Sequence, residues 1–375
     1  MLILFYNAFQ LNLNSTKIIR KSKINYKKFF FITIILMFFG GISGYFLTSL
    51  NIPMAFLLGG FLVAAILVKF INKVGKANYF VPDKVRYFFF GIIGSVIGAG
   101  FSDISSYLST DLLITFFSVT CLTIVCQQLN YIIFRKLGHY DKVTAFFSAT
   151  PGGLLESINA GERYGGDERI ITIQHFLRIM IVVLIVPIFF LIFFERPNNL
   201  EEKLILNPLK DYNLEFLFLT TFLGLILGYK LAVPARYFIC PLFLSAFLNA
   251  SGIVNFSCPD WLLFISQLVV GIALGARLLG LNFNLLRKCL VLSAISSTIM
   301  LTMAFFLSLL LIHLLTIPQE ILFISFVPGG VTEMSLMAIV LSSDATFVTI
   351  HHIWRIVIVV AEIVILSRLN LFKSG

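Results

Sequence analysis

One set of polar residues occurs twice in a chain that is otherwise strongly apolar. Each copy has a Pro-Gly-Gly run, a glutamate three residues later, and a histidine and an arginine three residues apart. The first copy consists of Pro151, Gly152, Gly153, Glu156, His175 and Arg178. The second, 177 residues later, consists of Pro328, Gly329, Gly330, Glu333, His352 and Arg355. Carboxylates can bind a cation or a proton, and guanidinium groups bind carboxylate or phosphate. The set therefore predicts a substrate-binding or ion-binding site, and we assign no catalytic residue, metal site or cofactor.

Each of these residue types also has a structural interpretation. The glutamates and arginines could form buried ion pairs within each copy, because arginine suits buried pairing. The histidines could relay protons or be satisfied core residues. Asp167 and Asp344 stand just before the segments that carry the histidines, which favours helix N-capping. If a helix resumes after each Gly-Gly, both glutamates lie near its positive N-terminus. The free N–H groups there could also receive an anionic substrate.

The composition defines the class of protein that carries this set. Of the 375 residues, 59% are apolar and 12% are charged. That leaves too little polar surface for a water-soluble globule, which excludes a soluble enzyme or a DNA-binding protein. A membrane-spanning helix needs about 20 mostly apolar residues. Ten such spans are predicted, at approximately 29–50, 54–72, 86–102, 111–134, 170–194, 213–232, 236–255, 260–279, 289–314 and 346–367.

Two further apolar stretches, 143–164 and 320–343, are broken by the Pro-Gly-Gly runs. Non-helical backbone exists at membrane depth only where protein or a water-filled cavity satisfies it. We therefore predict re-entrant hairpins or broken helices there. Elsewhere, Gly91, Gly94 and Gly98 lie along roughly one helical face, which predicts close packing against another helix.

The duplication extends to Gly94 and Gly98, which match Gly271 and Gly275 at the same offset. If each broken stretch enters and leaves on one side, each copy has five spans and the second copy is inverted. With the N-terminus inside, this topology puts 23 of the 28 Lys and Arg residues inside, as the positive-inside rule favours. The prediction is an all-α polytopic membrane protein of two inverted five-helix repeats, each with a re-entrant or broken-helix segment.

The predicted organisation has five parts. They are a basic cytoplasmic arm at 1–28, membrane repeat one at 29–194, an external linker at 195–212, membrane repeat two at 213–367 and a cytoplasmic tail at 368–375. We expect a multi-pass protein of the bacterial inner membrane with both termini in the cytoplasm. Its expected partners are the lipid bilayer, a small-molecule substrate and a coupling ion, and no nucleic acid. A homodimer is left open.

The doubled pattern P-G-G-x-x-E, followed by Asp and a downstream H-x-x-R, resembles the bacterial AbrB-type membrane proteins. This duplicated family also bears an ammonia monooxygenase label, and the resemblance covers residues from about 30 to 367. The second copy departs where His351 stands in place of Gln174 and where Pro187 has no match, which argues against identical roles for the halves. The labels imply gene regulation or ammonia oxidation. The sequence has no compact set of histidines and carboxylates of the kind that an oxygenase needs to bind copper or iron. An effect on gene expression would act indirectly, through a transported solute.

Inverted repeats with broken helices facing each other at mid-membrane are the build of secondary transporters. We therefore expect a transporter of a small metabolite, with anions among the candidates, coupled to protons or sodium and working by alternating access. The hairpin tips would meet near the midplane beside Arg178 and Arg355, one half-site holding the substrate and the other the ion. The alternatives are an AbrB-type regulator of gene expression and a membrane-bound monooxygenase.

One acidic residue of the second copy has no acidic match in the first. Glu362 lies seven residues after Arg355, on roughly the same helical face, and its counterpart in the first copy is Ile185.

Overall fold

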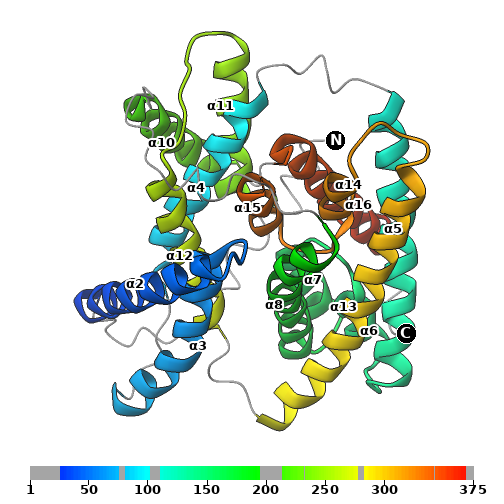
Figure 1. The fold of residues 1–375 in the computed structure, drawn as a ribbon. Coiled ribbons are helices and arrows are strands. Elements are labelled where there is room, and N and C mark those ends of the chain that lie inside the picture. Colours follow the sequence, from blue (N-terminus) through cyan, green and yellow to red (C-terminus); the bar gives the residue numbers. More distant parts are fainter. Residues whose placement is uncertain are drawn as a thin grey trace.

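The computed structural model describes residues 26–75, 81–101, 110–194, 213–231, 233–277, 283–341 and 343–368. The described ranges are all-helical and contain no strand (Figure 1). The helices are α2 (Tyr26–Ser49), α3 (Ala55–Gly75), α4 (Asp83–Ala99), α5 (Thr110–Lys136), α6 (Lys142–Ala149), α7 (Leu154–Arg163), α8 (Glu168–Phe193), α10 (Leu214–Lys230), α11 (Arg236–Ala250), α12 (Asp260–Ala276), α13 (Phe283–Leu311), α14 (Gln319–Phe326), α15 (Val331–Val340) and α16 (Ala345–Arg368). The predicted linker, and nearly all of the predicted arm and tail, lie outside the described residues.

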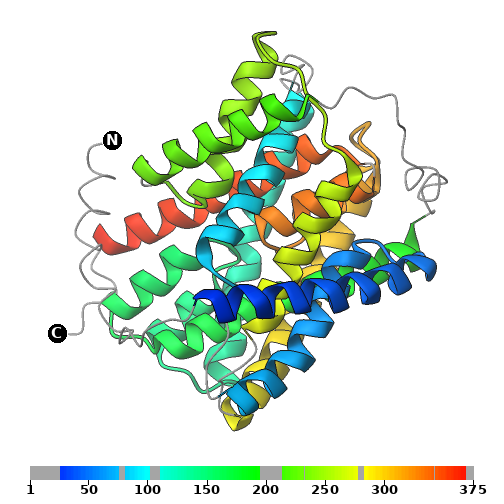
Figure 2. The same ribbon diagram turned by 90° about the vertical axis from the view of Figure 1, so that its left-hand side faces the viewer.

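The helices form two groups that each mix the two halves of the sequence (Figure 1). The first group, which we call the glycine bundle, contains α2, α3, α4, α10, α11 and α12. The second, the break bundle, contains α5 to α8, α13, α14 and α16. α15 packs on α14 and α16 and also contacts α4, so it lies between the bundles. Figure 2 shows the same arrangement turned by 90°. Neither half of the chain folds as a separate unit, because helices from one half pack against helices from the other.

The glycine bundle is held by backbone contacts at the predicted glycine face. A Cβ atom on Gly94 of α4 would overlap the carbonyl oxygen of Phe238 in α11. At the equivalent place, a Cβ on Gly271 of α12 would overlap the carbonyl oxygen of Leu57 in α3. Small residues allow helix axes to approach this closely inside a membrane. The prediction of close packing at this face is confirmed, and the equivalent glycine of the second copy makes an equivalent contact; each contact joins one half of the chain to the other.

Both predicted breaks lie where the Pro-Gly-Gly runs stand. α6 ends at Ala149 and α7 begins at Leu154, while α14 ends at Phe326 and α15 begins at Val331. The glycines at the restart are required for different reasons. Gly153 has φ of +58°, a left-handed conformation that favours glycine. Gly330 has φ of −71°, but a Cβ there would overlap the Glu333 carboxylate.

Five helices are long and apolar enough to cross a membrane. Their apolar segments are Phe31–Ser49, Asp111–Lys136, Glu168–Phe193, Leu285–Leu311 and Ala345–Leu366. The other five predicted spans are also helical, but α4, α10 and α12 have 17 residues each and α11 has 15. At 1.5 Å per residue, 17 residues reach about 25 Å, short of a hydrocarbon core of about 30 Å. Ten crossings therefore stay a prediction.

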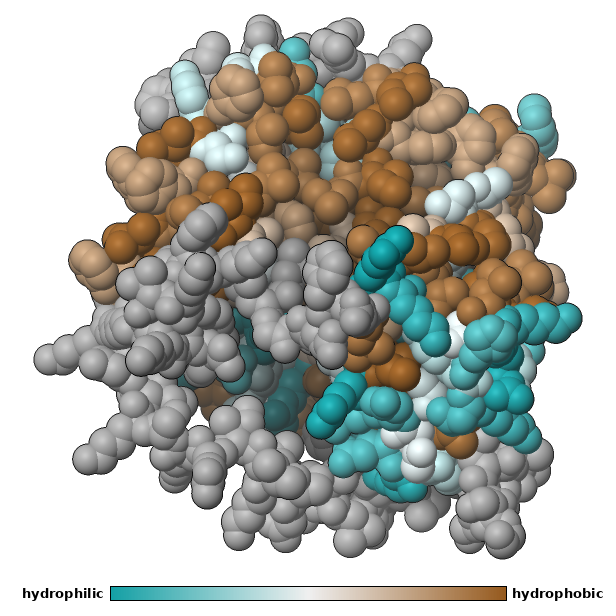
Figure 3. Space-filling view, turned by 90° about the horizontal axis from the view of Figure 1, so that it is seen from below, coloured by the Kyte–Doolittle hydropathy of each residue, from teal (hydrophilic) through white to brown (hydrophobic). Residues whose placement is uncertain are grey.

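Much of the outer surface is apolar. Phe117, Phe193 and Phe306 are among the large apolar side chains that are more than half exposed. Figure 3 shows hydrophobic residues covering much of one face, with hydrophilic residues gathered on one side. Contiguous apolar areas of this extent are rare on monomeric soluble proteins. They suit contact with lipid and agree with the five apolar helices.

Candidate functional site

The predicted residues His175 and Arg178 hold the end of the helix that precedes the first break. Arg178 Nη2, on α8, donates to the carbonyl oxygen of Thr150 at 2.7 Å and contacts His175 Nδ1 at 2.9 Å. Arginine is only a donor, so Nδ1 accepts and the proton of the imidazole is on Nε2. That nitrogen donates to the carbonyl oxygen of Phe147 at 2.8 Å. The pair thus satisfies carbonyl groups that the C-terminus of α6 leaves without partners.

The second copy repeats these contacts at equivalent positions. Arg355, on α16, donates from Nη1 to the carbonyl oxygen of Val327 at 2.7 Å and from Nη2 to that of Gly329 at 2.9 Å. It also contacts His352 Nδ1. His352 Nε2 lies 3.0 Å from the carbonyl oxygen of Ile324. Both histidines are buried with both ring nitrogens partnered, which favours the interpretation as satisfied core residues over a proton relay.

Neither of these buried arginines has an acidic partner among the described residues. Arg178 is 4% exposed and Arg355 is 3% exposed, and neither forms an ion pair within the described part of the chain. The alternative of buried Glu–Arg pairs is therefore not realised. In both residues the Nε–H group is buried and has no hydrogen-bond partner in the part of the chain that the structure describes. An uncompensated buried charge costs several kcal/mol, so this arrangement is the kind that a bound anion would complete.

The two glutamates lie in the first turns of the helices that resume after the breaks, as predicted. Glu156 is in the first turn of α7 and Glu333 in that of α15. A Cβ on Gly153 would lie 3.5 Å from Glu156 Oε2, and the Glu333 carboxylate folds back over Gly330 in the same way. Each carboxylate thus stays at a helix N-terminus, where the partial positive charge favours it. Each break thus has a guanidinium bound to its carbonyl groups and a carboxylate in the first turn of the helix that follows it.

The α16 helix brings the two breaks together. Arg355 is bound to the second break, and a Cβ on Gly152 of the first break would lie 3.7 Å from Arg355 Cγ and 3.9 Å from its Nε. One turn later, Val359 would be 3.1 Å from a Cβ on Gly153. The second arginine is thus next to both Pro-Gly-Gly runs, whereas the described contacts of Arg178 are with the first break only.

Sequence reasoning missed the polarity of the first break. Thr150 Oγ1 lies 2.7 Å from Ser157 Oγ and 3.3 Å from His175 Nε2, and all three residues are buried. At the equivalent positions the second copy has Val327 and Met334. The signal was present in the alignment of the two copies, where these hydroxyl side chains are aligned with apolar side chains. The two half-sites therefore share a backbone plan but differ in chemistry.

The capping prediction for the two aspartates is confirmed. Asp167 Oδ1 accepts from the backbone N–H of Arg169 at 2.9 Å and of Ile170 at 3.3 Å. Asp344 Oδ1 accepts from the backbone N–H of Phe347 at 2.9 Å. These contacts fix the beginnings of α8 and α16, the helices that carry the arginines.

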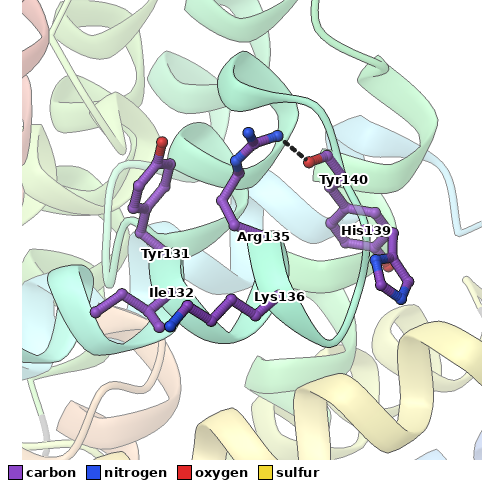
Figure 4. Close-up of a pocket in the computed structure, with 6 residues that line it drawn as sticks. All are labelled: Tyr131, Ile132, Arg135, Lys136, His139 and Tyr140. Atoms are coloured by element: carbon purple, nitrogen blue, oxygen red, sulfur yellow. Dashed lines mark hydrogen bonds between the residues drawn. The ribbon is translucent and has the colours of Figure 1, made fainter.

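A surface pocket lies apart from these residues, at the end of α5 (Figure 4). It has a volume of about 550 Å³ and is lined by Tyr131, Ile132, Arg135, Lys136, His139 and Tyr140. Arg135 Nη1 donates to the carbonyl oxygen of Tyr140 at 2.7 Å. The Tyr140 hydroxyl accepts from Gln174 Nε2 at 2.9 Å, which connects the pocket wall to α8. None of the predicted site residues lines this pocket.

The described residues contain no group of three His, Cys, Asp or Glu side chains placed to hold a metal ion. The monooxygenase alternative therefore has no candidate metal centre in that part of the chain.

An all-helical fold with five membrane-length apolar helices, and two breaks held by buried arginines, defines a class of membrane protein with paired broken helices. More particularly, the chain belongs to the family described as transition state regulatory protein AbrB, which matches residues 56–370. The resemblance seen in the doubled motif is thus confirmed.

Two curated relatives match part of the chain. It is 24% identical over 256 residues to the uncharacterized protein YhjN of Bacillus subtilis (strain 168), covering 64% of this chain and 66% of that protein. It is 21% identical over 203 residues to a protein of Escherichia coli (strain K12) named as a candidate regulator AbrB, covering 53% and 57%. In both cases the chain covers less than two thirds of the relative's length. No solved structure matches the chain.

Proposed function

We propose that this protein is a secondary transporter of a small anionic solute in the bacterial inner membrane. The observation that carries the proposal is the pair of guanidinium groups of Arg178 and Arg355. Both are buried, both are bound only by neutral groups, and both keep an Nε–H without a partner. A carboxylate or phosphate group would satisfy that N–H and compensate the charge, because charge-assisted bonds to arginine are the strong ones.

Transport, rather than simple binding, is supported by the position of these groups. They hold two broken segments at equivalent places in a duplicated chain, and α16 contacts both segments. Broken helices whose termini face a site near the membrane midplane are a common build of secondary transporters. In our proposal the two repeats are inverted, the broken segments are re-entrant, and both chain termini are cytoplasmic. The solute binds beside Arg355 and is exposed to each side in turn.

The difference between the half-sites fits unequal roles. The second break presents Arg355, with Val327 and Met334 at the two positions where the first break has hydroxyl side chains, and we assign it to the anion. The first break adds the hydroxyl groups of Thr150 and Ser157. These two hydroxyl groups suit uncharged hydrogen-bonding groups of the same solute. Movement of the solute is coupled to a proton or a sodium ion.

The regulatory name of the family is compatible with this function. The chain has no soluble basic domain of useful size in its sequence. We infer that an effect on gene expression follows from the solute that the protein moves. A regulator that acts through a bound partner would not depend on Arg178 or Arg355.

The experiment is a thermal-stability screen of the purified full chain against phosphate, sulfate, succinate, glutamate and neutral analogues. A ligand that binds only the folded state at 100 times its Kd stabilises it by about 2.7 kcal/mol. We expect an anion to raise the Tm of the wild type and to leave the Tm of Arg355→Gln unchanged. Arg135→Gln, which changes an exposed arginine outside the site, is the matched control. An anion that stabilises Arg178→Gln and Arg355→Gln as well as the wild type would overturn the proposed site.

A hit is then tested for transport with the protein in liposomes. Uptake of the same solute, dependent on a proton or sodium gradient and absent in Arg355→Gln, is the expected result. Binding without gradient-dependent uptake by well-folded protein would contradict transport and favour a sensor or regulator.

A further inference from the structure

A third glutamate, Glu362, lies inside a candidate membrane span, away from the two breaks. Glu362 is on α16, within the apolar segment Ala345–Leu366, and is half-buried. Gln127 Nε2, on α5, donates to Glu362 Oε1 at 2.9 Å. Within the described part of the chain no basic side chain forms an ion pair with Glu362. A carboxylate at membrane depth without a cationic partner is costly when ionised and is usually functional.

The partner of Glu362 is itself incompletely satisfied. Gln127 is 1% exposed, and its Oε1 atom is buried without a hydrogen-bond partner. An ionised carboxylate offers only acceptors, whereas a protonated one also has an O–H to donate. When Glu362 is ionised, the Gln127 Oε1 atom has no donor among the described residues to accept from. A single proton on the Glu362 carboxyl group supplies that donor. Hard metal cations take about six oxygen ligands, more than this pair offers.

The pair lies on the contact between α5 and α16, where three side-chain hydrogen bonds connect the helices. The other two join Thr115 to His351 at 2.8 Å and Thr120 to Trp354 at 3.1 Å. Of these three hydrogen bonds, only the one between Gln127 and Glu362 involves a carboxylate. Glu362 is also two turns beyond Arg355 on one face of α16, since residues seven apart lie nearly in line. A change of charge at Glu362 therefore acts on the helix that holds the proposed anion site.

The other copy of the duplicated sequence lacks this pair. The residue equivalent to Glu362 is Ile185, and the residue equivalent to Gln127 is Ala304. The duplicated plan thus supplies two arginine-held breaks but only one such carboxylate.

We infer that Glu362, positioned by Gln127, is a proton-binding site, and that its proton is the one coupled to movement of the anion. The second part rests on the proposed function; the first does not. The helix α16 and the helices α5 and α7 that pack against it also carry other titratable side chains, among them Arg355, Cys126, Tyr131, Glu156, Glu162 and Arg163. None of them forms an ion pair with Glu362 within the described residues.

Proton binding is tested on the full chain in liposomes with dicyclohexylcarbodiimide, which modifies protonated carboxyl groups in apolar surroundings. Peptide mapping by mass spectrometry is expected to find the label on Glu362 and to show that labelling declines as pH rises. Glu362→Gln removes this label, while Glu168→Gln, at an exposed helix end, leaves it. Gln127→Leu removes the donor that favours the ionised form, so labelling persists to higher pH.

Absence of label from Glu362 of the folded wild type across the pH range would overturn the inference. Protection of Glu362 by sodium at constant pH would also overturn it and assign the site to that ion.

Coupling is tested separately, with the anion found in the stability screen. We expect the wild type to bind it more tightly as pH falls and Glu362→Gln to bind it with no pH dependence. An unchanged pH dependence in Glu362→Gln would contradict coupling. If no variant binds any anion while Glu362 still shows pH-dependent labelling, the proposed transport function fails and the proton site stands.

Discussion

Arg355 packs against Gly152, a residue of the other half of the chain. A Cβ on Gly152 would lie 3.7 Å from Arg355 Cγ, while the guanidinium donates to carbonyl groups of its own break. One side chain thus connects two segments that are far apart in sequence. Because the arginine is buried and its hydrogen bonds go to neutral groups, our proposal places the anion beside Arg355 and Gly152.

The space beside Gly152 gives a graded test of that position. A methyl group at 3.7 Å makes ordinary van der Waals contact, so Gly152→Ala should change stability by no more than about 0.5 kcal/mol and keep anion binding. Gly152→Leu needs the volume that Arg355 occupies. We expect it to fold with full helical content by circular dichroism but to lose the anion-dependent rise in Tm. Equal anion binding by both variants would show that the solute does not bind beside Arg355.

Two glycines with different surroundings, Gly94 of α4 and Gly41 of α2, predict opposite outcomes for the same substitution by alanine. A Cβ on Gly94 would overlap the Phe238 carbonyl, whereas one on Gly41 would lie 3.9 Å from Leu268 Cδ1. Forcing extra volume into such a contact costs about 1–3 kcal/mol, while Gly to Ala in an uncrowded helix gains up to about 1 kcal/mol. Thermal unfolding in one detergent should therefore rank Gly94→Ala below the wild type and Gly41→Ala at or above it. A Gly94→Ala protein as stable as Gly41→Ala would refute the close contact.

Asp141, the N-cap residue of α6, predicts how the stability of the protein depends on pH. Partial burial of Asp141 opposes its ionisation, but hydrogen bonds from Thr144 and the backbone N–H of Val143 outweigh this and hold its pKa below the ordinary value. A carboxyl with a lowered pKa stabilises the fold above its unfolded pKa of about 3.9, and this stability is lost as pH falls through the folded pKa. Asp141→Ala should cost about 0.5–2 kcal/mol at neutral pH and progressively less below pH 4.

The control for that measurement is Asp141→Asn, which keeps an oxygen acceptor at the cap but cannot ionise. Its stability relative to Asp141→Ala should not change across the same acid range. A constant difference between the wild type and Asp141→Ala from pH 7 to pH 3 would show that the charge of Asp141 does not contribute.

The inverted topology predicts labelling from opposite sides of the membrane. Glu168 and Ser343 stand just before or at the start of the two helices that carry the arginines. In a background without the natural cysteines, Glu168→Cys and Ser343→Cys should react with a membrane-impermeant maleimide from opposite faces of intact cells or oriented vesicles. Permeabilised membranes, in which both should react, provide the control. Labelling of both from one face would mean that the repeats are parallel.

The local features of this protein could be predicted from its residues alone. The apolar runs located the helices, the Pro-Gly-Gly runs located both breaks, and Asp167 and Asp344 marked helix beginnings, because each depends on residues within about one turn. The glycine face of α4 was also readable, since small residues at helical spacing are a property of one segment. The constant offset of 177 residues revealed the duplication without any coordinates.

The contacts between distant side chains could not be predicted in this way, because they depend on how the helices pack. Glutamate and arginine in each copy suggested ion pairs, but α8 and α16 dock so that each arginine reaches carbonyl groups more than 20 residues away, while each glutamate turns back to its own helix. The contact of Gln127 with Glu362 spans 235 residues. Such partners depend on how separate helices pack, and packing is set by the volume and backbone approach of residues distant in sequence, which local patterns do not specify.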